Sequence, residues 1–275
     1  MARDRGGRAH GGHGAVVGIV SGKGGVGKSA LAVGIATAAA AAGASTLLID
    51  GDVGLANADL LLGLVPRMDL GDAVAGRCGL AEAIVRGPGG LELLVVGGAR
   101  TALPTLERAL HGDPAEPLAR LLAARRLTLL DLGAGIGADV ITLARHCDPV
   151  WLVATPEPTS LADAYATAKQ LWERAPTLRI ELVVNRITDR AAGERTHRAL
   201  DRMSRRFLAR PLPLRAALPE DAAMLRAVAC QRPVALSAPD APVARRLRLL
   251  AESLLEERAE RGHGERATPT ASAPR

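Results

Sequence analysis

A glycine-rich loop, SGKGGVGKS at residues 21–29, lies between the apolar run AVVGIV (15–20) and the alanine-rich segment 30–43. The first flank has the length and composition of a buried strand, and the second is typical of a helix. A strand, a glycine loop and a helix start in this order form the context that the phosphate-binding P-loop requires. Glycines let consecutive backbone N–H groups turn inward, and the helix N-terminus adds partial positive charge. The loop therefore predicts a nucleotide site within an α/β fold.

Two lysines in this loop are expected to be chemically required. The chain has 35 Lys and Arg residues, yet lysine occurs only at positions 23, 28 and 169. Lysine offers phosphate a compact point charge, whereas the wide Arg fork would crowd a tight backbone loop. We expect Lys28 to reach the β- and γ-phosphates of ATP and the Ser29 hydroxyl to bind Mg²⁺. The predicted nucleotide contacts of the loop are Gly22, Lys23, Gly24, Gly25, Val26, Gly27, Lys28 and Ser29.

Two other interpretations of the loop remain open at this point. The pattern G-x-G-x-x-G within residues 22–27, with Asp50 ending the next strand, also fits an NAD(P)-binding oxidoreductase. That alternative leaves Lys28, Ser29 and a second acid, Asp131, without a role. A glycine turn without a ligand is the third interpretation, and the strand-to-helix context disfavours it.

Two acidic strand ends supply the carboxylates that a P-loop needs to hold Mg²⁺ and to order water. The segment LLIDGD ends a strand with Asp50 and Asp52, and LTLLDLG carries Asp131. We predict Asp131 to act on the metal directly or through its water, with Asp50 and Ser29 in the metal shell. The structural alternative for Asp131 is an acid that ends a strand and caps the next helix.

Short apolar runs rich in Val, Leu and Ile alternate with longer segments of helical period, and the runs lack in–out alternation. Such strands are buried on both faces, which predicts an α/β fold with a doubly wound, mostly parallel sheet and helices on both faces. One P-loop ATPase domain is expected at 15–260, between disordered segments at 1–14 and 261–275. The predicted strands are 15–20, 45–50, 91–96, 127–132, 150–155 and 180–185.

The net charge of +6 could suit nucleic acid or an anionic surface. Nucleic acid is disfavoured because the basic residues are scattered and the four aromatic residues are too few for base stacking. The three cysteines never form a C-x-x-C pair, so a reducing cytosol is expected. Neither a secretory h-region nor a membrane-spanning run occurs, although a peripheral membrane contact stays open.

These residues resemble the deviant Walker A ATPases of the MinD/ParA family, whose loop has the form K-G-G-x-G-K-[ST]. The additional lysine of that loop is Lys23 here. The resemblance implies that Lys23 reaches across a dimer interface to the partner's ATP, so that the chain forms an ATP-bound homodimer. It further implies that Asp52 positions the hydrolytic water, with Lys23, Lys28, Asp52 and Asp131 as catalytic residues of an ATPase with weak basal activity.

The resemblance also implies contacts around the nucleotide base. Asn185 matches the residue that usually recognises adenine, while a polar residue that merely ends a strand is the alternative. Asn57 follows Asp52 in the same switch segment. The predicted contacts outside the loop are Asn57, Asn185, Pro219 and Asp221.

Within the family, the segment TPEPTSLADAYATAKQL (155–171) looks most like FlhG, also called FleN or YlxH, which controls flagellar number and placement. This implies flagellar partners such as the GTPase FlhF, a cytoplasmic location and a peripheral position at the inner membrane face or cell pole. The N-terminal segment 1–14 lacks the FlhF-activating motif of such proteins. A MinD- or ParA-type role in cell division or partitioning is the alternative.

MinD-type proteins often end in an amphipathic membrane helix. Here the segment 243–261 has its apolar residues at 243, 247, 250 and 254 on one narrow stripe, with both charge signs opposite. We interpret it as the last core helix rather than as a membrane anchor.

Overall fold

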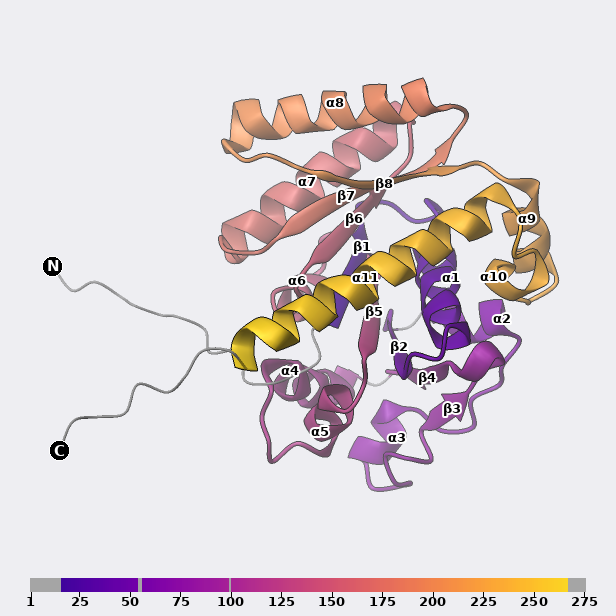
Figure 1. The fold of residues 1–275 in the computed structure, drawn as a ribbon. Coiled ribbons are helices and arrows are strands. Elements are labelled where there is room, and N and C mark those ends of the chain that lie inside the picture. Colours follow the sequence, from indigo (N-terminus) through magenta and orange to yellow (C-terminus); the bar gives the residue numbers. More distant parts are fainter. Residues whose placement is uncertain (1–15, 54–55, 99, 267–275) are drawn as a thin grey trace, which may run out of the picture.

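All six predicted strands form in the computed structural model, which describes residues 16–53, 56–98 and 100–266. They belong to one eight-stranded sheet with the order β3-β4-β2-β5-β1-β6-β7-β8, and every neighbouring pair is parallel except β3 and β4 (Figure 1). The doubly wound parallel sheet is therefore confirmed. The strands are β1 (Val16–Ser21), β2 (Thr46–Gly51), β3 (Ile84–Arg86), β4 (Glu92–Val95), β5 (Leu127–Ala134), β6 (Val150–Ala154), β7 (Ile180–Ile187) and β8 (Leu214–Pro219).

The two strands that were not predicted lie at the two edges of the sheet. β3 has three residues and is the antiparallel edge strand. β8 follows Pro213, ends at Pro219 and lacks the continuous apolar run of the central strands. Proline cannot donate to a strand ladder, so it is typical of edges.

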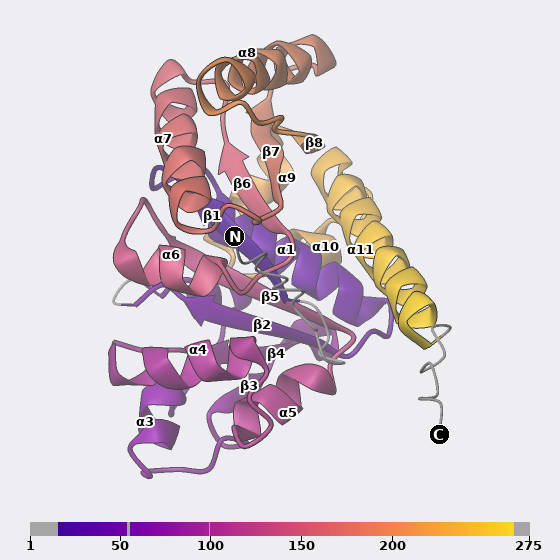
Figure 2. The same ribbon diagram turned by 90° about the vertical axis from the view of Figure 1, so that its left-hand side faces the viewer.

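Helices cover both faces of the sheet, as Figure 2 shows. One face carries α1, α2, α9, α10 and α11, and the other carries α4 to α8. The helices are α1 (Lys28–Ala41), α2 (Ala58–Leu62), α3 (Leu70–Val74), α4 (Leu103–His111), α5 (Pro117–Ala123), α6 (Ala138–Ala144), α7 (Pro158–Arg174), α8 (Arg190–Leu208), α9 (Ala222–Ala229), α10 (Val234–Ser237) and α11 (Pro242–Arg266), with 3₁₀ turns at Pro88–Gly90 and Arg100–Ala102.

Each central strand contributes to two separate cores. In β2, Leu47 and Ile49 pack under α4 and α5, whereas Leu48 points to the opposite face and packs under α1. Successive side chains of a strand point to opposite faces, and here both faces are dry. This is why the strand sequences lack polar residues at alternate positions.

The C-terminal helix α11 packs on α1 across the sheet face, as Figure 1 shows in yellow and indigo. Its four predicted stripe residues are all buried, with Leu247 fully inaccessible. A Cβ on Gly34 of α1 would lie 2.6 Å from Leu247 Cδ1, so the two helices meet at the closest approach that glycine allows. The prediction of a core helix is confirmed. The helix is described to Arg266, past the boundary predicted at 260, while segments 1–14 and 267–275 lie outside the described residues.

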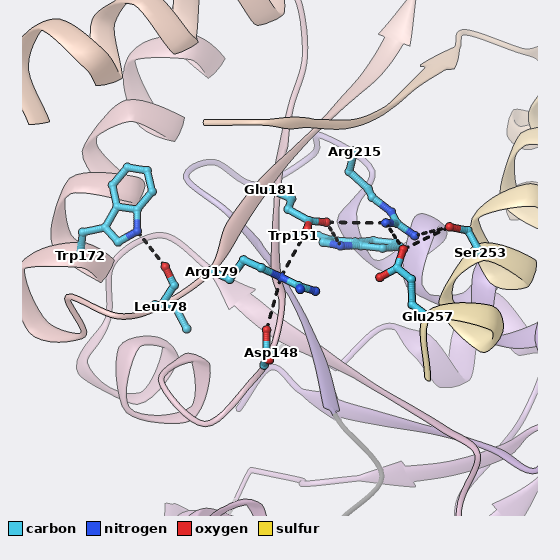
Figure 3. Close-up of polar contacts among 9 residues, drawn as sticks. All are labelled: Asp148, Trp151, Trp172, Leu178, Arg179, Glu181, Arg215, Ser253 and Glu257. Atoms are coloured by element: carbon cyan, nitrogen blue, oxygen red, sulfur yellow. Dashed lines mark hydrogen bonds and ion pairs between the residues drawn. The ribbon is translucent and has the colours of Figure 1, made fainter. Parts of the chain in front are cut away.

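A polar network joins α11 to the starting ends of β6, β7 and β8 (Figure 3). The buried Trp151 donates its indole N–H to Glu181 at 3.1 Å, and the Arg215 guanidinium lies 5.1 Å from the Trp151 ring centroid. Arg215 also donates to Glu257 at 2.5 Å and to Ser253 at 2.9 Å on α11. These side chains fix α11 at the end of the sheet opposite to the glycine loop.

Candidate functional site

The glycine loop lies at the carboxyl end of β1, in the middle of the sheet. Gly25 and Gly27 have φ angles of 81° and 92°, a backbone region that residues with a Cβ rarely adopt. A Cβ on Gly24 or Gly25 would meet no atom within 4 Å, so the space above the loop is open. α1 begins at Lys28, directly after the loop. The loop therefore forms an open cradle in front of a helix N-terminus, which is a binding geometry for phosphate.

Lys28 and Asp131 form a buried ion pair below this cradle. The Lys28 Nζ donates to Asp131 Oδ1 at 2.6 Å, and both side chains are less than 10% exposed. A second contact joins Lys28 Nζ to Ser29 Oγ at 3.3 Å. Burial raises the pKa of Asp131, and the Lys28 charge opposes that shift. Lys28, Ser29 and Asp131, three of the four residues predicted to act on phosphate and metal, are thus brought together.

Asp50 lies beside Asp131, because the two residues are Cα partners in the parallel pairing of β2 and β5. Its carboxylate accepts three backbone N–H groups, from Asp52 at 3.1 Å and from Asn57 and Ala58 at 2.9 Å each. Burial raises the pKa of Asp50 to about 6, although these hydrogen bonds oppose the shift. Asp50 therefore holds the start of α2, a role that the sequence did not predict.

Asp52, the predicted water-positioning acid, lies next to the segment that follows Asp131. A Cβ on Gly133 would be 3.3 Å from Asp52 Oδ1, so the two strand ends approach closely here. Asp52 adds negative charge to the surroundings of Asp131. The site thus gathers Lys28 and three carboxylates at the carboxyl ends of β1, β2 and β5.

Of the four predicted base contacts, Asn185 is the one whose contact with the loop is shown, and both it and Asp221 make side-chain hydrogen bonds within the protein. Asn185 donates its amide to the Val26 carbonyl at 2.8 Å, and a Cβ on Gly27 would lie 2.5 Å from its Nδ2.

Asp221 caps α9 by accepting from Ala223 N at 2.8 Å and also accepts from Val243 N at 3.2 Å. Asn57 is the N-cap residue of α2, and Pro219 ends β8. Adenine recognition by these four residues stays a prediction.

Lys23 has two contacts that the sequence did not predict. Its Nζ lies 3.0 Å from Glu157 Oε2 and 3.2 Å from Thr159 Oγ1, at the start of α7. Both residues belong to the segment 155–171 that carries the resemblance to FlhG. No spacing rule could pair residues 134 positions apart, because their contact depends on where α7 packs.

The donor set fits Mg²⁺ and a nucleotide phosphate. Asp131 Oδ2 is buried without a hydrogen-bond partner among the described residues, so one carboxylate oxygen is left to a ligand. Mg²⁺ is commonly bound by one or two carboxylates together with substrate phosphates rather than by an all-protein cage. In the described part of the chain, no group of three or more His, Cys, Asp or Glu side chains is arranged so that it could hold a metal ion without further ligands. Likewise, none of the described helices combines the length and apolarity needed to cross a bilayer.

The chain resembles characterised proteins over most of its length. It is 33% identical over 219 residues to the antiactivator FleN of Pseudomonas aeruginosa, covering 80% of this chain and 78% of FleN. It is 30% identical over 193 residues to the flagellum site-determining protein YlxH of Helicobacter pylori, covering 70% of this chain and 65% of YlxH.

The fold agrees with these similarities. The cell division ATPase MinD of Pyrococcus furiosus superposes with a TM-score of 0.70 at 26% identity, covering 89% of this chain and 99% of that structure. The family model described as the CobQ/CobB/MinD/ParA nucleotide binding domain matches residues 17–234. The buried Lys28–Asp131 pair and this match leave no support for the NAD(P)-dependent alternative. The chain therefore belongs to the CobQ/CobB/MinD/ParA family of nucleotide-binding proteins.

Proposed function

We propose that the chain is a Mg²⁺-dependent ATPase that dimerises around ATP and thereby controls the number or placement of flagella. The observation that carries the ATPase part is the buried ion pair between Asp131 and Lys28, the residue with which α1 begins directly after the glycine loop. The flagellar part is supported by the similarity to FleN and to the flagellum site-determining YlxH.

Phosphate binding would require Lys28 to exchange partners. Its Nζ is held on Asp131 Oδ1 at 2.6 Å, and the γ-phosphate would attract the same ammonium. Asp131 is then left as a buried carboxylate that needs another cation. When bound, Mg²⁺ would supply that charge and neutralise the phosphate oxygens. Ser29 and Asp131 would hold it, and Asp52 would orient the attacking water.

Lys23→Ala tests the dimer. We expect this variant to bind ATP like the parent chain but to stay monomeric in gel filtration with light scattering. Lys169→Ala is the matched control, since Lys169 is an exposed lysine paired only with Glu173 at 3.8 Å among the described residues. If Lys23→Ala dimerises with ATP as the parent does, the shared-nucleotide model is wrong.

A role in cell division is the second candidate, favoured by the similarity to the cell division ATPase MinD. A deletion strain separates the two roles. Cells with an altered number or position of flagella and normal septa would support the flagellar role. Displaced septa with normal flagella would support the second candidate, and a tagged protein at one pole rather than in an oscillating pattern would agree with the first.

A further inference from the structure

Lys23, the lysine proposed to act across the dimer, pairs with two residues of its own chain. Its Nζ donates to Glu157 Oε2 at 3.0 Å and to Thr159 Oγ1 at 3.2 Å. The Lys23 side chain is 39% exposed and that of Glu157 58% exposed. The contact therefore lies at the surface, where a second molecule can reach it.

The backbone around Lys23 is also fixed against α7. A Cβ on Gly22 would lie 2.3 Å from the backbone of Asp163, so the loop touches the first turns of this helix. Ser21 Oγ donates to the Lys23 carbonyl at 3.0 Å. These contacts place the Lys23 side chain over the start of α7, so its pairing there follows from the packing of the loop.

Glu157 makes no competing use of its carboxylate. It is the residue that precedes α7, yet its side chain does not cap the helix. A separate hydrogen bond fixes the chain before α7, in which Ser160 Oγ accepts from the backbone N–H of Thr155 at 2.9 Å. Among the described residues, the Glu157 carboxylate has no ion pair or hydrogen bond except the one with Lys23.

We propose that Glu157 and Thr159 form a latch that holds Lys23 in the monomer and competes with the partner's nucleotide for the same ammonium group. This inference rests on the proposed ATP-dependent dimer. Lys23 already directs two of its three N–H donors to Glu157 and Thr159 of its own chain, so a phosphate of the partner's ATP competes with these residues for the same ammonium group. Dimerisation therefore requires each chain to release its latch first.

The strength of the latch follows from its exposure. An exposed ion pair contributes a factor of up to about five to an equilibrium. A symmetric dimer releases two latches, so their combined effect reaches about 30-fold at most. The latch would thus shift the equilibrium between monomer and ATP-bound dimer toward the monomer, without preventing dimerisation.

Glu157→Gln tests the latch because it removes the charge and keeps the shape. In Mg²⁺ with a slowly hydrolysed ATP analogue, we expect the dimer dissociation constant to fall by about 2- to 30-fold. Thr159→Val should shift it in the same direction by less. The affinity of the monomer for the nucleotide should not change. Glu173→Gln is the matched control, since Glu173 is an exposed acid of α7 that pairs with Lys169.

A weaker or unchanged dimer in Glu157→Gln would overturn the proposal, because Glu157 would then support the interface or have no part in it. The double variant Lys23→Ala with Glu157→Gln should be as monomeric as Lys23→Ala. If the parent chain itself does not dimerise with ATP, the proposed function is wrong. The contact between Lys23 and Glu157 is then tested only by the reactivity of Lys23 in the monomer.

The monomer provides that separate readout. The chain has only three lysines, so mass spectrometry can follow the acetylation of each amine. In the nucleotide-free chain, Glu157→Gln should make Lys23 up to about fivefold more reactive while Lys169 stays unchanged. Equal reactivity of Lys23 in the parent and in the variant would show that no latch exists.

Discussion

Lys28 and Asp131 illustrate how much a single buried pair determines at this site. Both side chains are almost inaccessible, and each is the only oppositely charged partner of the other among the described residues. Desolvation of two charges is costly, and a pair of this kind is stable only while both members are present. Without nucleotide, the charges of Lys28 and Asp131 cancel each other. Once a phosphate attracts Lys28, the negative charge of Asp131 is left without its partner.

Removal of one member should expose this cost. We expect Lys28→Met to lower the free energy of unfolding by about 3 to 5 kcal/mol, because Asp131 is left buried and unpaired. The double variant Lys28→Met with Asp131→Asn should recover most of that loss, and neither variant should bind ATP. Urea denaturation monitored by circular dichroism measures the stability. A single variant as stable as the parent would contradict the charge argument.

Asp50 gives a prediction about pH. Its pKa is raised from 3.8 to about 6, mainly by burial, so the folded chain binds the proton more tightly than the unfolded chain. The resulting stabilisation is complete below pH 3.8 and is lost as the pH rises through 6. The stability of the parent relative to Asp50→Asn should fall by up to about 3 kcal/mol over that range. Chemical denaturation of both chains between these pH values tests this, and a constant difference would contradict it.

Lys28 and Ser29 could be predicted because the loop motif fixes their spacing, and Asp131 because it follows an apolar strand of the same parallel sheet. Asp52 was predicted only from the resemblance to the family, and it lies beside Asp131. The pairing of Lys23 with Glu157 could not be predicted, since it depends on how α7 packs beside the loop. The hydrogen bonds of Asp50 depend in the same way on where the chain turns into α2.

At the scale of elements, the contact between α1 and α11 makes the C-terminal helix part of the core. The apolar stripe of α11 is buried against the sheet face that α1 also covers. The residues of this stripe are therefore occupied by packing within the fold. The stripe was visible in the sequence, but its counterpart Gly34 was not, because a glycine within a helix has no pattern of its own.

Gly34→Ala should therefore destabilise the protein, although alanine is the better helix former. Its Cβ would lie 2.6 Å from Leu247 Cδ1, and overpacking of this kind costs about 1 to 3 kcal/mol. Leu247→Ala alone should cost about 2 to 5 kcal/mol by leaving a cavity. The double variant should cost less than the sum of the two, as a thermal and urea double-mutant cycle would show. A more stable Gly34→Ala variant would refute the close approach.

At the scale of the whole molecule, ligand and fold are linked because the site is assembled from strands at the centre of the sheet. A ligand that binds only the folded chain raises its stability with the logarithm of concentration. At 100 times its dissociation constant, Mg²⁺-ATP should add about 2.7 kcal/mol. Thermal unfolding with Mg²⁺-ATP and with NAD measures this, and stabilisation by NAD instead would contradict the proposed site.

Dimerisation makes the melting temperature depend on protein concentration as well. With Mg²⁺-ATP present, the melting temperature of the parent should rise with protein concentration, whereas that of Lys23→Ala should not. Equal slopes for the two chains would argue against a dimer that depends on Lys23.

The two edges of the sheet bear on how copies of this chain can meet at all. β3 is three residues long, and β8 follows Pro213 and ends with Pro219, so one edge is short and the other has proline at both of its limits. Short and proline-bordered edges oppose the addition of a foreign strand, which is the first step of fibril growth. Contacts between copies of this chain are therefore favoured through side chains rather than through continuous β-structure.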